Sequence, residues 1–341
     1  MNLFVGRNGH GKTNVLEALQ FFEFGRSFRT LRDTDLIHFD SEFCRFEVGT
    51  TTSDGDKERY AASVERSGGK RIKVGEKDVG RYSEMIGRYP CVLFGPHDLA
   101  VVSGLPAERR KFVDAIGSMT DRGYLQELRS YRRVVRQRNA AFKARRTQEA
   151  LGVWTEDLIQ RGCAVTRRRI ELIGAIEKAL EPHINAMGVA FEVKIRYESE
   201  LIDRPEEVTC EEQFAARLAS VEAEETRRGI TMVGPHRDDI TITADGHDLR
   251  RYGSQGQRRL MAILLRLAEL SHLEAKLGEP CVLLLDDMFS ELDETVTQNL
   301  KRVLTADRQV FVTSPIAMDW VDTEGTKVFH IEEGRVRVEV A

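Results

Sequence analysis

The chain has 341 residues, of which 41% are hydrophobic, and it carries a formal net charge of −4. This composition excludes a disordered chain, and the length suggests one large domain or two. The slightly acidic balance neither indicates nor excludes a nucleic-acid partner, so local patches of charge must decide that question.

The cysteines are odd in number, scattered along the chain and form no C-x-x-C pair. We expect them to be small buried residues in a reducing cytosol, and neither disulfides nor a metal site. No stretch approaches the roughly 18 apolar residues of a membrane span, and no signal segment opens the chain. We therefore expect a cytoplasmic protein without a membrane partner. The cysteines are Cys44, Cys91, Cys163, Cys210 and Cys281.

In the first half of the chain the predicted secondary structure changes from mainly strands to helices. A short apolar strand, residues 2–5, leads into a glycine-rich loop and a helix with apolar residues at helical spacing. From about residue 42 alternation predicts hairpin strands, and residues 91–94 predict a buried strand. Residues from about 105 to 188 carry helical periodicity and are rich in arginine.

The second half returns to strands. "VAFEVKIRYE" and "ITIT" alternate like strands, with a turn near Asp245, and the acidic stretch 206–225 predicts an exposed helix. "RRLMAILLRLAEL" predicts an apolar-faced helix, whereas "CVLLLDD" and "RQVFVTS" are typical of buried parallel strands. "KVFHIEEGRVRVEV" predicts a closing hairpin. Sheet elements at both ends of a helical block predict a discontinuous core domain.

The loop "GRNGHGKT" matches G-x-x-x-x-G-K-[ST] between a strand and a helix, the context of a phosphate-binding loop. Its backbone N–H groups and the helix N-terminus favour a bound phosphate. Lys12 can reach the β- and γ-phosphates, and the Thr13 hydroxyl can bind Mg²⁺. A Rossmann site is not supported, because the third glycine is missing. The residues expected to hold the nucleotide are Gly6, Arg7, Asn8, Gly9, His10, Gly11, Lys12 and Thr13.

The strand "VLLLDD" supplies the carboxylates that a phosphate loop needs. Its C-terminal edge, where such sheets bind ligands, presents Asp286 and Asp287. We expect Asp286 to hold Mg²⁺ and Asp287 to orient or deprotonate the attacking water. The alternative is an acidic turn after a strand, which the pairing with the phosphate loop disfavours.

A third motif, "GSQGQRRL", lies before the carboxylate strand and opens an apolar helix. Ser254, Gly256 and Gln257 at a helix N-terminus form a second anion-binding device, although an ordinary helix cap would look similar. The order of phosphate loop, serine motif, carboxylate strand and "SELD" (Ser290 to Asp293) is typical of ABC-type ATPases. In that class the serine motif of one subunit closes over the nucleotide of the other. The sequence contains no N-K-x-D motif, which a GTPase would use to recognise guanine.

These motifs predict an α/β fold, an ABC-type P-loop ATPase head with an inserted helical domain (lobe II). The cofactors expected are ATP and Mg²⁺. We expect the ATPase core to comprise residues 1–100 and 230–341, and the mostly helical insertion to comprise residues 101–229.

The chain resembles the RecF family of SMC-like ATPases nearly from end to end. The resemblance rests on "GRNGHGKTNVLEAL", "GRSFRT", "GLPAERRKFVD", "GPHRDD", "YGSQGQRR" and "LLLDDMFSELD". It implies a weak DNA-dependent ATPase of DNA repair, recombination and replication, associated with the nucleoid and the SOS response. It also implies an ATP-dependent homodimer that binds gapped or junction double-stranded DNA, with single strands also possible, and that assists RecA loading with RecO and RecR.

The resemblance carries over residue by residue. Lys12 and Thr13 would hold ATP and Mg²⁺, Asp286 and Asp287 would form the Walker B pair, and Ser254 and Gln257 would act in trans across the dimer. The family usually has another strand pair before the loop, so the N-terminus here is expected to be shortened. The switch position is Thr313 or Ser314, where transporter ATPases have histidine, and no Q-loop glutamine lies between residues 20 and 126.

The arginine-rich block is the candidate DNA surface, because clustered cations bind the phosphate backbone. An equally good interpretation is that these arginines form a solvent-exposed helical face that binds no partner. Arg237 in "GPHRDD" would contact DNA, brace the nucleotide site or belong to a buried cluster. The residues proposed for DNA contact are Arg132, Arg133, Arg136, Arg138, Arg145 and Arg146.

Three rival functions remain open. A transporter-coupling ATPase is disfavoured by Thr313 and by the arginine-rich insertion. A structural SMC-type protein would need a far longer coiled coil. A nucleotide-binding protein that has lost hydrolysis is the third possibility.

Overall fold

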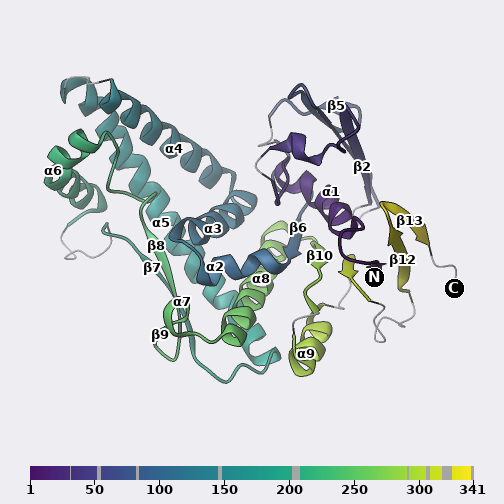
Figure 1. Ribbon diagram of the computed structural model, residues 1–341. Coiled ribbons are helices and arrows are strands. Elements are labelled where there is room, and N and C mark those ends of the chain that lie inside the picture. The colour runs from purple at the N-terminus through teal and green to yellow at the C-terminus, as the bar shows by residue number, and fades with distance from the viewer. Residues whose placement is uncertain are drawn as a thin grey trace. The chain divides into compact units, whose positions relative to one another are not determined.

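Figure 1 shows the computed structural model of the chain. The structure describes residues 1–30, 32–51, 55–81, 84–144, 148–201, 208–289, 292–304, 308–316 and 325–338, with the backbone alone at 148–150. Two compact units divide the chain: Met1–Pro96 with Leu273–Ala341, and His97–His272. No helix in these described ranges is both long enough and apolar enough to cross a bilayer.

The compact units differ from the expected domain limits at two places. Residues 97–100 and the longer segment 230–272, both expected with the ATPase core, fall in the second unit. The reason is packing, because β8 (Asp239–Ala244) pairs antiparallel with β7 (Val193–Glu198) and the pair packs on the helices of that unit. The limits of the ATPase core as a functional domain stay a prediction.

The first unit contains a six-stranded sheet in the order β13-β12-β1-β11-β10-β6. All neighbours are parallel except β12 and β13, which form an antiparallel hairpin. The apolar runs expected to be parallel strands therefore lie in the centre of this sheet. Its strands are β1 (Asn2–Val5), β6 (Cys91–Phe94), β10 (Val282–Asp286), β11 (Val310–Ser314), β12 (Lys327–Glu332) and β13 (Arg335–Val338).

Helix α1 (Lys12–Phe24) packs between this sheet and a second one. Phe21 and Phe22 are fully buried and share a core cluster with Tyr60 of the second sheet and Leu284 of the first. The second sheet is antiparallel, in the order β2-β3-β4-β5, as the alternating sequence predicts. The remaining elements of this unit are η1 (Asp33–Leu36), β2 (Phe43–Thr51), β3 (Lys57–Glu65), β4 (Lys70–Val74), β5 (Lys77–Asp78) and α9 (Glu294–Leu304).

The second unit is mostly helical and also holds the small sheet β7-β8-β9. Two of its long helices, α4 and α5, run side by side and enclose a core with α6 around Phe214 (Figure 1). Local signals set the helix ends: Asp121 caps α4, and Thr209 with Glu212 forms a capping box on α6. The elements are η3 (Pro96–Asp98), α2 (Leu99–Ser103), α3 (Pro106–Thr120), α4 (Arg122–Lys143), α5 (Gln148–Ala186), α6 (Cys210–Arg228), β9 (His247–Asp248), α7 (Leu249–Tyr252) and α8 (Gln255–Leu277), which begins here and ends in the first unit.

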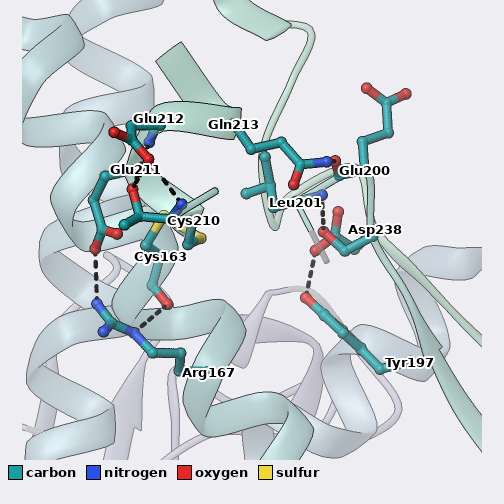
Figure 2. Close-up of a disulfide and its surroundings, with 12 residues drawn as sticks. Cys163, Arg167, Tyr197, Glu200, Leu201, Cys210, Glu211, Glu212, Gln213 and Asp238 are labelled. Atoms are coloured by element: carbon teal, nitrogen blue, oxygen red, sulfur yellow. Dashed lines mark hydrogen bonds and ion pairs between the residues drawn. A yellow bond between two sulfur atoms is a disulfide. The ribbon is translucent and has the colours of Figure 1, made fainter. Parts of the chain in front are cut away.

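The expectation that no cysteine is paired is wrong for one pair. Cys163 of α5 and Cys210, the first residue of α6, form a disulfide with a Cα–Cα distance of 5.9 Å (Figure 2). The pairing depends on how α6 packs on α5, which brings together residues 47 apart in sequence. Spacing along the chain carries no signal of such a contact. Among the described residues, Cys44, Cys91 and Cys281 stay outside any disulfide.

Candidate nucleotide-binding site

The glycine-rich loop joins β1 to α1 and is organised around Lys12. The Lys12 side chain is buried, and its Nζ donates to the Gly6 carbonyl at 2.6 Å, the Arg7 carbonyl at 3.2 Å and Asn8 Oδ1 at 3.4 Å. Gly9 and Gly11 have φ of 84° and 102°, left-handed values that side chains rarely tolerate. The ammonium is therefore already held at the loop whose backbone amides would surround a phosphate.

The hairpin β12–β13 supports the other side of this loop. A Cβ added to Gly6 would lie 2.2 Å from the Ile331 carbonyl oxygen of β12, so only glycine fits there. The Gly334 N–H in the hairpin turn donates to the His10 carbonyl at 3.1 Å, and the Gly6 N–H donates to the Ser314 carbonyl at 3.3 Å. Sequence reasoning missed this support, because the hairpin follows the loop by more than 300 residues.

The structure brings Thr13 and Asp286 into direct contact, as their motifs predict. The Thr13 hydroxyl donates to Asp286 Oδ1 at 2.9 Å, and Asp286 lies buried at the C-terminal end of β10. One hydroxyl and one carboxylate are oxygen donors that suit Mg²⁺, an ion that keeps several waters and phosphate oxygens as further ligands. The residues present therefore fit the expected ion. Within the described residues no cluster of three or more His, Cys, Asp or Glu side chains suits a metal.

Thr313, at the end of β11, links the two Walker B aspartates. Its hydroxyl donates to Asp286 Oδ1 at 2.8 Å and accepts from the Asp287 N–H at 3.0 Å. Asp287 has φ of 47°, a left-handed conformation that costs a non-glycine residue about 1–2 kcal/mol. Such strain is typical of functional sites. Of the two candidates for the switch position, Thr313 contacts both carboxylate residues, and its role as a switch stays a prediction.

The serine motif forms a reciprocal cap on α8. The Ser254 N–H donates to Gln257 Oε1 at 2.8 Å, and the Gln257 N–H donates to Ser254 Oγ at 3.2 Å. These bonds match a capping box and leave Ser254 at a helix N-terminus. Both residues belong to the second compact unit, whereas Lys12 and Asp286 belong to the first. Ser290 of the "SELD" motif lies outside the described residues.

The six arginines proposed for DNA contact separate into four groups. Arg138 is corrected to a structural residue, because it is buried and donates to Glu225 at 2.7 Å. It falls on the same face of α4 as the buried Tyr131, one heptad earlier. Arg132 is exposed but donates to Asp114 at 2.7 Å. Arg133 and Arg136 are exposed, and Arg145 and Arg146 lie outside the described residues.

The "GPHRDD" loop is anchored by a buried network. Arg169 donates to the Pro235 carbonyl at 2.6 Å and to both oxygens of Asp114, and Tyr197 donates to Asp238. Burial raises the pKa of Asp238 above its usual value. A buried Arg–Asp network therefore anchors this loop, but Arg237 is not part of it, because its side chain is exposed at the surface.

Comparisons with known proteins identify the family of the chain. Residues 1–318 match the family model described as RecF/RecN/SMC N terminal domain. The DNA replication and repair protein RecF of Chloroherpeton thalassium is 33% identical over 334 residues, 95% of this chain and 91% of the relative. The chain belongs to the RecF family. The RecF of Halothermothrix orenii is 35% identical over 347 residues, 98% of this chain and 92% of the relative.

Solved structures confirm the fold of this RecF family member. The recombination mediator protein RecF with ATP, of the RecFOR pathway, superposes with a TM-score of 0.90 at 30% identity. That comparison covers 99% of this chain and 91% of the solved one. An SMC head bound to a domain of ScpA shares the fold alone, with a TM-score of 0.57 at 15% identity. The expectation of an ABC-type P-loop ATPase head with a helical insertion is therefore confirmed.

Proposed function

We propose that this protein is an ATP-dependent DNA-binding protein of recombinational repair and replication restart in the cytoplasm. It dimerises on ATP, binds gapped or junction duplex DNA and assists RecA loading with RecO and RecR. The observation that carries the proposal is the contact of Thr13 with Asp286 beside the preorganised Lys12. The RecF family and its ATP-bound relative support it further.

Each residue of the site has a chemical task in ATP hydrolysis. Lys12 exchanges its bonds to loop carbonyls for bonds to the β- and γ-phosphates. Mg²⁺, when bound by Thr13 and Asp286, neutralises charge that develops on the phosphates. Asp287 orients the attacking water and accepts its proton, and Thr313 fixes the position of that residue through the backbone N–H. From the resemblance to the RecF family we expect turnover to be weak and to depend on DNA.

Dimerisation follows from the charge of the γ-phosphate. The N-terminus of α8 at Ser254 is a second anion-binding end, and in the dimer it contacts the nucleotide held by Lys12 of the other copy. Hydrolysis removes that bridging phosphate, so ATP favours the closed dimer and ADP favours release of DNA.

The first test compares the natural chain with Lys12→Met, with Lys77→Met on the exposed strand β5 as a matched control. We expect ATP turnover and ATP-dependent retention of gapped DNA at low salt in the natural chain and the control, and loss of both in Lys12→Met. Absence of DNA binding at every salt and nucleotide condition contradicts the mediator function. DNA retention on ATP without turnover identifies a nucleotide-binding protein that has lost hydrolysis.

A second test concerns the shared site. Lys12→Met and Ser254→Arg subunits, each inactive alone, are mixed in equal amounts. If sites are shared across the dimer, a mixed dimer contains one intact site and recovers ATP turnover. No recovery contradicts action in trans.

A further inference from the structure

Helix α4 carries a row of cations along its exposed face. Successive members are separated by seven, four, three and seven residues. At about 100° per residue these positions fall within an arc of roughly 80°. All of them are exposed. We call this row the α4 cationic stripe, and its members are Arg122, Arg129, Arg133, Arg136 and Lys143.

The stripe differs from the other arginines of α4, Arg132 and Arg138, because its charges are uncompensated. Among the residues that the structure describes, no stripe member makes an ion pair or a side-chain hydrogen bond. By contrast, Arg132 pairs with Asp114 and the buried Arg138 pairs with Glu225. The one acidic residue of α4, Glu127, lies outside the arc and faces Arg161 of α5 at 3.5 Å.

Rows of like charge weaken a helix, so this arrangement is unfavourable without an anionic partner. The chain as a whole carries a net charge of −4, so the row of five cations does not reflect an overall excess of positive charge. The stripe spans roughly 30 Å at 1.5 Å per residue. Duplex DNA presents a charge every ~1.7 Å of its axis, so about nine base pairs match this length. Arginine also binds phosphate oxygens in a bidentate manner.

The aromatic residues of α4 distinguish duplex from single-stranded DNA. Tyr124, Tyr131 and Phe142 are all buried on the opposite face, in contact with the core of the unit. Single-strand binding surfaces stack bases on exposed aromatic rings, and the stripe has none. The stripe therefore lacks the rings that stack unpaired bases, which favours contacts with the phosphates of a duplex, and phosphate contacts do not report base sequence.

The helix is also held rigidly enough to present a fixed row of charges. The Asp121 carboxylate accepts from the N–H groups of Gly123 and Tyr124 and so caps its first turn. Tyr131 and Val134 belong to the core that α4 shares with α5 and α6. Figure 1 shows α4 extended along α5 over most of its length.

We propose that the α4 cationic stripe binds the phosphate backbone of duplex DNA without sequence preference. The proposal rests on the proposed function and adds the surface and the form of DNA. In this proposal Arg122, Arg129 and Lys143 are DNA contacts, and Arg132 and Arg138 are not.

The test neutralises the centre of the stripe in Arg129→Gln/Arg133→Gln/Arg136→Gln. The matched control, Arg217→Gln/Arg227→Gln/Arg228→Gln, removes the same charge from exposed positions on α6 that pair with Glu200 and Glu224. Fluorescence anisotropy of a labelled 30-base-pair duplex is measured from 50 to 200 mM KCl with a non-hydrolysable ATP analogue. Circular dichroism and ATP-analogue affinity establish that each variant remains folded and binds nucleotide.

We expect the stripe variant to lose at least about tenfold in duplex affinity at 100 mM KCl, and its salt slope to fall by about 3. The control should retain the affinity and slope of the natural chain. If the natural chain binds duplex and the stripe variant binds like the control, the stripe proposal is wrong and the proposed function stands. Failure of the natural chain to bind any DNA rejects the proposed function itself.

Photo-cross-linking gives a readout that does not depend on charge. A benzophenone amino acid replaces Ala140, which lies exposed within the arc of the stripe, or Ala219, which lies exposed on α6. The Ala140 probe should cross-link to duplex DNA in the presence of the ATP analogue, and the Ala219 probe should not. Equal yields from both positions, or none from Ala140 under conditions where duplex is bound, contradict the proposal.

Discussion

His236 shows how a single side chain in the "GPHRDD" loop depends on its surroundings. Its Nε2 lies 3.1 Å from the Thr231 carbonyl oxygen, which can only accept, so Nε2 carries the proton. Nδ1 then accepts from the hydroxyl of the buried Tyr131. Burial is the largest cause that lowers the pKa of His236 to about 4. The neighbouring cations Arg237, Arg110 and Arg169 act in the same direction, against the opposing effect of the Thr231 carbonyl. The imidazole is therefore neutral in the folded protein.

This depressed pKa predicts a loss of stability at mildly acidic pH. Below about pH 6.5 the unfolded chain binds a proton at His236 that the folded protein does not, so the free energy of unfolding falls as pH falls toward 4. We expect His236 to account for about 2 kcal/mol of lost stability between pH 7.5 and pH 5. Urea unfolding at both pH values measures the loss.

The matched variant for that measurement is His236→Gln, which keeps an acceptor for Tyr131 and a donor for Thr231 but does not titrate. Its stability should fall by less than that of the natural chain over the same pH range. Equal losses in both proteins would place the pH dependence in other groups. The buried Asp238 is not one of them, because burial raises its pKa and the folded protein therefore gains stability from that carboxyl as pH falls.

At the scale of elements, the disulfide joins the middle of α5 to the first turn of α6. Arg167, one turn after Cys163, donates to Glu211 at 2.9 Å and to the Cys163 carbonyl at 3.4 Å, so polar contacts surround the same junction (Figure 2). The bond closes a chain segment of 47 residues that contains all of β7. Cross-links that close long segments restrict the unfolded chain most.

We predict that reduction of this disulfide destabilises the protein by up to about 4 kcal/mol, from the entropy of closing such a segment. Thermal unfolding with and without dithiothreitol measures the effect. Cys163→Ala/Cys210→Ala should unfold at the same temperature with and without reductant. The denatured, unreduced natural chain should react with three equivalents of a thiol reagent, from Cys44, Cys91 and Cys281; five equivalents would show that no disulfide forms.

At the scale of the molecule, the nucleotide site is assembled from both ends of the chain. The first unit combines residues 1–96 with residues 273–341. Strand β1, which leads into the phosphate loop, has both of its sheet neighbours, β11 and β12, in the second segment. The loop itself contacts Ser314 and Gly334 from that segment. The position of the phosphate loop therefore depends on contacts with residues from the other end of the chain.

We predict that a chain ending at residue 272 does not bind ATP, although it contains the whole motif from Gly6 to Thr13. Without β10, β11 and β12, strand β1 has no sheet to join and Thr13 has no Asp286 to contact. Fluorescent ATP-analogue titration checks this, with full-length Lys12→Met as the comparison for loss of a single group. An ATP-analogue affinity within tenfold of that of the natural chain would contradict assembly of the site from both ends of the chain.

Strand and helix positions were largely predictable because their signals are local. The hairpins from residue 42 and at the C-terminus, the buried strands and the helical block all appear where periodicity places them. The burial of Arg138 also had a local signal, since it lies in phase with Tyr124 and Tyr131 at intervals of seven residues. The prediction that Arg138 contacts DNA rested on its charge alone. It was wrong because this arginine pairs with a buried glutamate and is part of the core.

The sequence by itself determined the motifs and hence the family, because the spacing of a phosphate loop or the carboxylate end of a strand is set by backbone geometry over a few residues. Tertiary structure alone decided the contacts between them. Thr13 meets Asp286 across 273 positions, Ile331 excludes any side chain at Gly6, and Cys163 meets Cys210. Such pairs depend on strand order and helix packing, which arise from burial summed over the whole chain and leave no trace in local spacing.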